Sequence, residues 1–221
     1  MRLTLVKLLS KGTNILRSCR LGIELEKCQL LVGSKVLLDS PLAAFFGPGE
    51  LNIVAGPNGC GKTSLLDVLA MRAKPAKGSH IFRKGHSKPT DIAYLPQAVV
   101  HLGDVTVRDL VLLAFRNSGA PTGAPSQIGR ILGNTKRECG DLSGGERQIL
   151  LFWLVASQQA QVFVYDEPFR HLDEASANVV TRTIEHQVRC GELVIISEHS
   201  EVARWEVPTR RLDLTKGTTV N

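Results

Sequence analysis

A glycine-rich segment that ends in lysine and threonine is the clearest chemical feature of this sequence. Residues 56–63 read Gly-Pro-Asn-Gly-Cys-Gly-Lys-Thr, which matches the spacing G-x-x-x-x-G-K-[ST]. Glycines allow the backbone to turn so tightly that successive N–H groups point at phosphate oxygens. Lys62 is long enough to reach β- and γ-phosphates, and the Thr63 hydroxyl can ligate Mg²⁺. The candidate phosphate-binding residues are Gly56, Pro57, Asn58, Gly59, Cys60, Gly61, Lys62, Thr63 and Ser64.

Two adjacent carboxylates follow an apolar run further along the chain. Residues 162–165 read Val-Phe-Val-Tyr, which is typical of a buried strand, and Asp166 and Glu167 come next. We expect this strand to lie beside the phosphate-binding loop, where Asp166 would hold the Mg²⁺ shell. Glu167 would act as a general base and polarise a water toward the γ-phosphate. Taken alone, an Asp-Glu pair of this kind is more often a solvated strand end, and the upstream Lys62 is what favours catalysis.

A second glycine turn lies between these two features and precedes an apolar helix predicted over residues 148–157. The N-terminus of a helix carries a partial positive charge that attracts phosphate. A Ser-Gly-Gly turn is also a common helix cap, so a purely structural role is the alternative. Its position between the loop and the acidic pair favours a second phosphate cradle. The residues of this turn are Leu142, Ser143, Gly144, Gly145 and Glu146.

The elements that must position these residues alternate between strands and helices. Residues 51–55 predict a buried strand directly before the glycine loop, and residues 63–71 predict a helix after it. Residues 193–197 predict another buried strand. This alternation is typical of a parallel, doubly wound α/β sheet, which binds ligands at the carboxyl ends of its strands.

The segment between the first strands and the second glycine turn is less regular. Thr106 and Asp109 have the spacing of a capping box, which predicts a helix through Phe115. Residues 117–126 are rich in Gly, Pro and Ala and predict a flexible loop. The uncharged run over residues 148–165 is interrupted by serine and glutamines, so we expect a buried helix and a buried strand there and no membrane span.

The charged residues of the chain are unevenly distributed. Of 27 Lys and Arg, five lie before the first acid, Glu24, and the remainder nearly balance the 21 Asp and Glu. We therefore expect no nucleic-acid partner, because the basicity belongs to one arm. Residues 1–21 are interpreted as a basic N-terminal extension, with a mitochondrial transit segment and a membrane-surface segment as alternatives. The five scattered cysteines include no C-x-x-C pair, which argues against a disulfide framework or a zinc site.

In this order, the motifs resemble those of ABC (ATP-binding cassette) ATPases, whose LSGGQ-type signature is similar to residues 142–146. The resemblance implies an α/β fold of the P-loop NTPase class and ABC type over residues 22–221. Such a fold has a mostly parallel core sheet flanked by helices, an antiparallel β edge, and a small helical subdomain, here at about residues 98–150. The implied ligands are ATP and Mg²⁺. Residues 30–33 lack the aromatic side chain that stacks on adenine in the family, so strict selectivity for ATP does not follow.

The resemblance also assigns roles to residues outside the glycine loop. Gln97, which ends the sequence Tyr-Leu-Pro-Gln, corresponds to a residue that contacts Mg²⁺ and the attacking water, and His199 to one that contacts the γ-phosphate. Asp173 corresponds to the D-loop, which crosses the dimer interface. Family members hydrolyse ATP as head-to-tail pairs, so the signature would act in trans within a homodimer. The candidate catalytic residues are Glu167, His199 and Gln97, and the candidate Mg²⁺ ligands are Thr63, Gln97 and Asp166.

The function implied by the resemblance is that of the motor subunit of an ABC transporter. Its permease would be a separate integral membrane chain, and the motor would bind at the cytoplasmic face of the membrane. The matrix side of the mitochondrial inner membrane is the alternative if residues 1–20 are a transit segment. Haem-export, cytochrome c maturation and metal-uptake cassettes are similarly small. The rival interpretation is a soluble ABC ATPase acting in macromolecular assembly or repair, while Glu167 and His199 together disfavour a regulator without hydrolysis.

Overall fold

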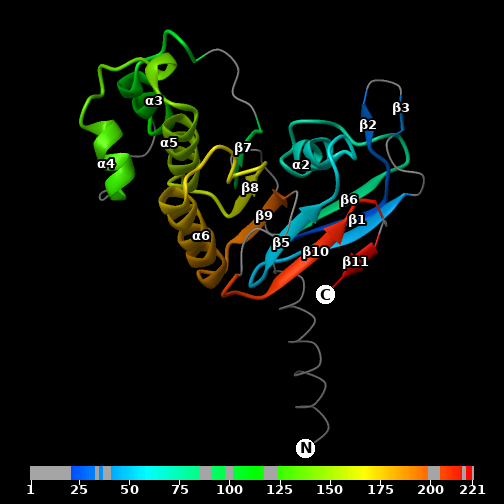
Figure 1. Cartoon of the computed structure of the whole chain (residues 1–221). Helices are drawn as coiled ribbons and strands as arrows, with labels where there is room; N and C mark the ends of the chain where they lie inside the picture. Colours follow the sequence, from blue (N-terminus) through cyan, green and yellow to red (C-terminus); the bar gives the residue numbers. More distant parts are fainter. Residues whose placement is uncertain are drawn as a thin grey trace, which may run out of the picture.

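The computed structural model describes residues 21–32, 35–36, 41–84, 91–97, 102–116, 124–198, 205–215 and 218–220. Within these ranges the chain forms a six-stranded sheet, a three-stranded sheet and a two-stranded hairpin, with helices packed against both faces of the largest sheet (Figure 1). Residues 1–20 of the predicted extension and the candidate residue His199 lie outside the described residues.

The six-stranded sheet contains the strands predicted around the glycine loop and the acidic pair. Its order is β11-β10-β5-β9-β8-β7, in which β11 is antiparallel and the other five strands are parallel. This arrangement confirms the predicted α/β class. The strands are β5 (Leu51–Ala55), β7 (Ile92–Leu95), β8 (Val162–Tyr165), β9 (Leu193–Glu198), β10 (Thr209–Asp213) and β11 (Thr218–Val220).

The acidic strand has one neighbour that the sequence did not predict. We expected β8, which ends before Asp166, to lie beside the glycine loop, and the hydrogen bond from Thr63 to Asp166 confirms this contact. Strand β8 does not pair with β5 itself, because β9 pairs with β5 on one side and with β8 on the other. The end of β9 therefore lies next to the acidic pair.

The second sheet is antiparallel and shares a core with the first. It has the order β4-β1-β6, from β1 (Gly22–Cys28), β4 (Leu42–Phe46) and β6 (His80–Lys84). Helix α2 (Lys62–Leu69) packs in this shared core through Leu65, Leu66 and Leu69. The short strands β2 (Leu31–Val32) and β3 (Lys35–Val36) form a separate hairpin.

Alternate residues of the parallel strands enter two different cores, as expected for side chains that point to opposite faces. The core shared with α2 and the small sheet receives Val54, Val162, Val164, Leu193, Ile195 and Leu212. The core on the other face receives Leu51, Ile53, Phe163, Tyr165, Val194 and Ile196. Because both faces are covered, every residue of β5, β8 and β9 is buried, which explains their continuous apolar runs.

Four helices gather at one end of the molecule (Figure 1). They are α3 (Val107–Ala114), α4 (Ser126–Leu132), α5 (Gly144–Ala156) and α6 (Glu174–Arg189). The N-cap half of the predicted capping box is confirmed, since the Asp109 N–H donates to the Thr106 hydroxyl at 3.1 Å. The Asp109 carboxylate in turn accepts from the Thr106 hydroxyl at 2.6 Å. Nowhere in the described ranges does a helix combine the length and the hydropathy that a bilayer crossing requires.

Two helices differ from the prediction. Helix α4 begins at Ser126, the last residue of the predicted loop, because Ile128 and Ile131 have a core to enter. Helix α5 begins at Gly144 and not near Gln148, because the side chain of Ser143 caps it four residues earlier. The low helix propensity of the glycines is outweighed by this cap and by tertiary packing.

Asn52 is the polar exception within β5, and it fixes the turn before that strand. Its amide nitrogen donates to the Gly47, Glu50 and Val194 carbonyls at 2.9, 3.2 and 3.1 Å, and the residue is 1% exposed. We predict that Asn52→Ala lowers the free energy of unfolding by about 1–3 kcal/mol, because buried carbonyls lose their donor. Urea denaturation measures this, and Asn178→Ala on the exposed face of α6 is the control. Equal effects of the two variants would contradict it.

Candidate functional site

The glycine loop joins the end of β5 to the start of α2. Gly59 and Gly61 have φ angles of 79° and 104°, in the left-handed region that glycine adopts without strain. Gly61 is the N-cap of α2, and as a glycine it has no side chain that could accept a hydrogen bond from the first N–H groups of the helix. The first N–H groups of the helix therefore face the space above the loop, where an anion would be bound.

Lys62 lies across the loop, although it is the first residue of α2. Its ammonium donates hydrogen bonds to the Gly56 carbonyl at 2.7 Å and to the Pro57 carbonyl at 3.0 Å. The residue is only 5% exposed, so the charge is held close to the loop backbone. A lysine in this position adds a point charge to the converging N–H groups, which is the arrangement that binds polyphosphate.

Thr63 and Asp166 meet at the carboxyl end of the sheet, although 103 residues separate them in sequence. The Thr63 hydroxyl donates to Asp166 Oδ2 at 2.7 Å. Asp166 is 1% exposed, and burial raises the pKa of its carboxyl. Hydrogen bonds from Ser197 and Thr63 lower this pKa, while the charges of Glu167 and Asp67 raise it.

The Thr63–Asp166 pair fits Mg²⁺ in its chemistry. A hydroxyl and a carboxylate are hard oxygen donors, and a cation would offset the cost of burying the Asp166 charge. Among the described residues no three His, Cys, Asp or Glu form a metal-binding group. A pair of one hydroxyl and one carboxylate suits an ion that takes its remaining ligands from water and substrate phosphates, as Mg²⁺ commonly does.

Glu167 and Gln97 come from the ends of β8 and β7 and open onto the glycine loop. Both line one cavity of about 320 Å³, so the structure brings the predicted base together with the predicted phosphate-binding residues. Glu167 has a φ of 50°, which is uncommon for a residue other than glycine. The other residues that line this cavity are Asn58, Gly59, Gly61, Lys62, Thr63 and Ser64.

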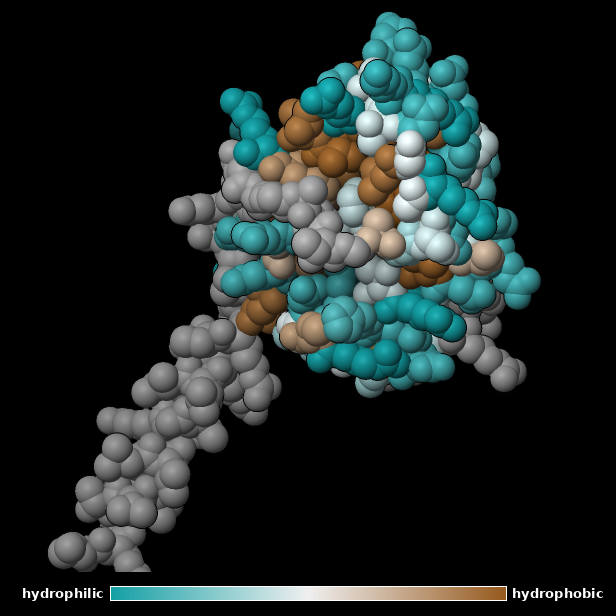
Figure 2. All heavy atoms as spheres, turned by 90° about the vertical axis from the view of Figure 1, so that its left-hand side faces the viewer, coloured by the Kyte–Doolittle hydropathy of each residue, from teal (hydrophilic) through white to brown (hydrophobic). Residues whose placement is uncertain are grey.

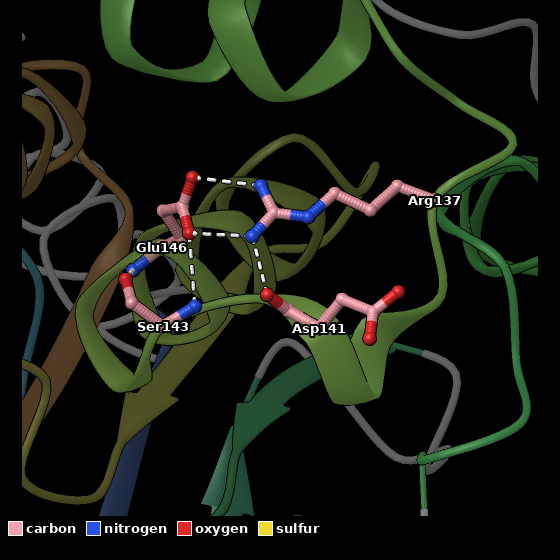
Figure 3. A network of polar contacts seen from close by, with 4 residues as sticks. All are labelled: Arg137, Asp141, Ser143 and Glu146. Carbon is pink, nitrogen blue, oxygen red and sulfur yellow. Dashed lines mark hydrogen bonds and ion pairs between the residues drawn. The ribbon is translucent and has the colours of Figure 1, made fainter.

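Ser143 and Glu146 form a reciprocal cap at the start of α5 (Figure 3). The Ser143 N–H donates to Glu146 Oε2 at 2.8 Å, and the Glu146 N–H donates to the Ser143 hydroxyl at 3.1 Å. Arg137 extends the cap, since its guanidinium donates to both oxygens of Glu146 at 3.0 and 3.2 Å and also to the Asp141 carbonyl. The segment before the helix is thereby fixed to the helix itself.

The signature residues line a different cavity from the glycine loop. Ser143, Gly145, Glu146 and Asp173 face a cavity of about 470 Å³. A Cβ added at Gly145 would lie 2.8 Å from the His171 carbonyl oxygen, so only glycine fits there. The Asp173 carboxylate caps α6 by accepting from the Ser176 N–H at 2.8 Å, and hydrogen bonds from Ser176 lower its pKa. Within one chain, these residues therefore lie together at a cavity that is separate from the cavity of the glycine loop.

Two polar residues of the site were missed in the sequence. Arg137 precedes the signature by several residues and carries no motif that would single it out. Ser197 lies at the end of the apolar run of β9 and contacts both members of the acidic pair. A hydroxyl directly after four buried apolar residues was the available signal.

The parallel sheet, the lysine-bearing glycine loop and the Thr63–Asp166 pair together define a nucleotide-binding protein of the P-loop class. The family model described as "ABC transporter" matches residues 41–170, which is more than half of the chain. The chain therefore belongs to the ABC transporter family and is similar to its ATP-binding proteins.

Two relatives and one solved structure illustrate this similarity. The zinc import ATP-binding protein ZnuC of Jannaschia sp. (strain CCS1) is 30% identical over 182 residues, covering 80% of this chain and 72% of the relative. The cytochrome c biogenesis ATP-binding export protein CcmA of Nitrosomonas europaea is 29% identical over 189 residues, covering 80% and 88%. An ABC transporter ATP-binding protein from Pyrococcus furiosus has a TM-score of 0.70 at 24% identity, covering 88% of this chain and 98% of its own. This structure confirms the ABC type of fold.

The charge of Glu146 gives the signature cap a defined pH dependence. The Ser143 N–H and the Arg137 guanidinium hold the pKa of Glu146 below its usual range. Because the pKa of Glu146 is lower in the folded protein than in the unfolded chain, its ionised carboxylate stabilises the fold. This stabilisation is fully present above the unfolded-state pKa of about 4.3 and is lost as the pH falls through the folded-state pKa. We predict that Glu146→Gln lowers the free energy of unfolding at pH 7, and that the difference from wild type shrinks below about pH 4.

Urea denaturation between pH 7 and pH 3 measures this difference. Glu26→Gln, which neutralises an exposed carboxylate on β1, is the matched control and should show a smaller effect at every pH. A Glu146→Gln difference that does not change with pH would contradict the assignment.

Proposed function

We propose that this chain binds ATP with Mg²⁺, hydrolyses it to ADP and phosphate, and thereby drives an ABC transporter. The observation that carries the proposal is the shared cavity in which Lys62, Thr63, Gln97 and Glu167 meet, with Asp166 hydrogen-bonded to Thr63. Transfer of a phosphoryl group to water requires a positive charge beside the phosphates, oxygen ligands for Mg²⁺, and a carboxylate that can accept a proton. Lys62, the Thr63–Asp166 pair and Glu167 are these three groups here.

Each residue has a distinct part in the proposed reaction. The residues of the glycine loop, from Gly56 to Ser64, hold the phosphates through backbone N–H groups, and Lys62 neutralises charge on the β- and γ-phosphates. Thr63, Asp166 and Gln97 hold the Mg²⁺ ion, which supplies further neutralisation of the phosphate oxygens when bound. Glu167 accepts a proton from the attacking water, and His199, which lies outside the described residues, contacts the γ-phosphate.

We propose further that two copies of the chain enclose the nucleotide. Within one chain, Ser143, Gly145 and Asp173 line a cavity other than that of the phosphate loop. This separation supports a head-to-tail homodimer in which the signature of one copy, including Leu142 and Gly144, meets the nucleotide held by the other. The N-terminus of α5 then presents its partial positive charge to the γ-phosphate.

The membrane partner is proposed to dock on the helical end of the molecule. Leu112 and Leu113 of α3 are 58% and 69% exposed, and Figure 2 shows apolar side chains on this otherwise largely hydrophilic face. Exposed apolar side chains that gather on one face favour a protein partner. This placement supports the proposed helical subdomain at about residues 98–150, a peripheral location at the cytoplasmic face of a membrane, and a separate permease chain.

The relatives narrow the proposed cargo. One relative is named for zinc import and another for cytochrome c biogenesis and export. We propose a metal ion, haem or another component of cytochrome c maturation as the substrate of the transporter. If the chain instead serves assembly or repair as a soluble ATPase, its purification from detergent-solubilised cells will recover no integral membrane protein with it.

The proposed base gives the first prediction about activity. Glu167→Gln should lower the ATPase rate by about 10²–10⁴-fold while nucleotide binding persists, because the amide no longer accepts the proton. The ATP-bound variant should then accumulate as a dimer in size-exclusion chromatography with light scattering. Unchanged turnover would remove Glu167 from the mechanism, and a monomer at saturating Mg-ATP would count against the paired arrangement.

The loop lysine gives a second prediction. Lys62→Ala should weaken binding of Mg-ATP at least about tenfold, because a charge-assisted contact to the phosphates is lost. Titration with a fluorescent ATP analogue measures the affinity, and Lys74→Ala, an exposed lysine beyond α2, is the matched control. Equal affinities of the two variants would rule out the phosphate-loop assignment.

A further inference from the structure

Ser197 carries a hydroxyl group at a buried position of β9, where the fold favours apolar side chains. The four residues that precede it in β9, Leu193–Ile196, are apolar and 0% exposed, and Ser197 itself is 1% exposed. A buried hydroxyl is costly unless it has hydrogen-bond partners. The contacts of this side chain therefore indicate why serine is present.

Both of its partners belong to the acidic pair. The Ser197 hydroxyl donates to Asp166 Oδ1 at 2.5 Å and accepts from the Glu167 N–H at 2.8 Å. The backbone N–H of Glu167 can only donate, and a hydroxyl has one proton, so the direction of both bonds is fixed. Ser197 thus links the backbone of Glu167 to the carboxylate of Asp166.

The order of the sheet explains how this contact arises. Strand β9 lies between β5 and β8, and Ile196 pairs with Tyr165, the residue before Asp166. Ser197 pairs on its other side with Val54 of β5. It therefore reaches the level of the acidic pair from the strand that lies between β8 and β5.

Ser197 and Thr63 together hold the Asp166 carboxylate at both oxygens. Oδ1 accepts from Ser197 and Oδ2 accepts from Thr63, so rotation of the carboxylate breaks at least one bond. The same hydroxyl holds the N–H of Glu167, whose φ of 50° is costly for a residue with a side chain. This backbone conformation sets the direction in which the Glu167 side chain leaves the strand.

We propose that Ser197 is a positioning residue for hydrolysis, which orients Asp166 toward Mg²⁺ and holds Glu167 in the conformation that faces the nucleotide. The inference rests on the proposed ATPase function and adds β9 as a fourth strand to the three, β5, β7 and β8, whose ends form the site. Ser197 is 1% exposed and its hydroxyl is engaged by Asp166 and Glu167, so we assign it no direct contact with the nucleotide or the attacking water.

Three variants separate positioning from mere packing. Ser197→Ala removes the hydroxyl, Ser197→Thr keeps it, and Ile195→Val removes a methyl group from the same buried strand without touching the acidic pair. The readouts are kcat and KM for ATP, the thermal midpoint of unfolding, and the Mg²⁺ dependence of affinity for a fluorescent ATP analogue. The last readout does not require turnover.

We expect Ser197→Ala to lower kcat by about 10- to 100-fold with KM for ATP within about twofold, since the lost bond is to a charged group. The Mg²⁺ concentration for half-maximal tightening of nucleotide binding should rise at least about threefold. Ser197→Thr should recover most of both effects. Ile195→Val should leave the kinetics and the Mg²⁺ dependence unchanged even where its thermal midpoint falls as much as that of Ser197→Ala.

The proposal is overturned if Ser197→Ala matches Ile195→Val in both kcat and Mg²⁺ dependence, whatever its stability. Loss of function in Ser197→Thr equal to that in Ser197→Ala, with the protein folded, also overturns it. If the added methyl group of Ser197→Thr prevents folding, the proposal is judged by comparing Ser197→Ala with Ile195→Val. Failure of the ATPase function is recognised separately, because the wild type would then show no turnover, while Mg²⁺-dependent nucleotide affinity still tests Ser197.

Discussion

The hydrogen bond between the Thr63 hydroxyl and Asp166 Oδ2 is the contact on which the site depends. It joins the first turn of α2 to the end of β8 at 2.7 Å, across 103 residues of sequence. For these two side chains to meet, β5, β9 and β8 must pair in parallel and end at the same edge of the sheet. The glycine loop must then turn back over that edge, which Gly59 and Gly61 allow through their left-handed backbone conformations.

The two cores of the protein hold this contact in place. Leu65, Leu66 and Leu69 anchor α2 on one face of the sheet, and burial of each side chain is worth about 1.5–3 kcal/mol. On the other face, α5 and α6 pack against alternate residues of the same strands. The apolar anchoring exceeds the cost of one buried carboxylate, so the raised pKa of Asp166 is compatible with a stable fold. A bound cation would relieve that cost, which couples nucleotide binding to the electrostatics of the site.

The chemistry of the site was more predictable from the sequence than its arrangement. The glycine loop and the acidic pair carry local patterns, and the fold belongs to the family that these patterns imply. The position of β9 between β5 and β8 depends on pairing between distant segments, which no local pattern records. Ser197 was missed for the same reason, because its two partners lie 31 and 30 residues away in sequence. Arg137 was missed because its role appears only once the signature turn has folded against α5.

The most direct test is a double-mutant cycle on the affinity for Mg-ATP, with Thr63→Ala, Asp166→Asn and the two changes combined. If the two side chains form one Mg²⁺-binding unit, each single change will remove most of the Mg²⁺-dependent tightening. The combined variant will then be little weaker than the worse single variant, with a coupling energy of about 1 kcal/mol or more. Effects that add within about 0.3 kcal/mol would show that the two residues act independently, and the account of the site would be wrong.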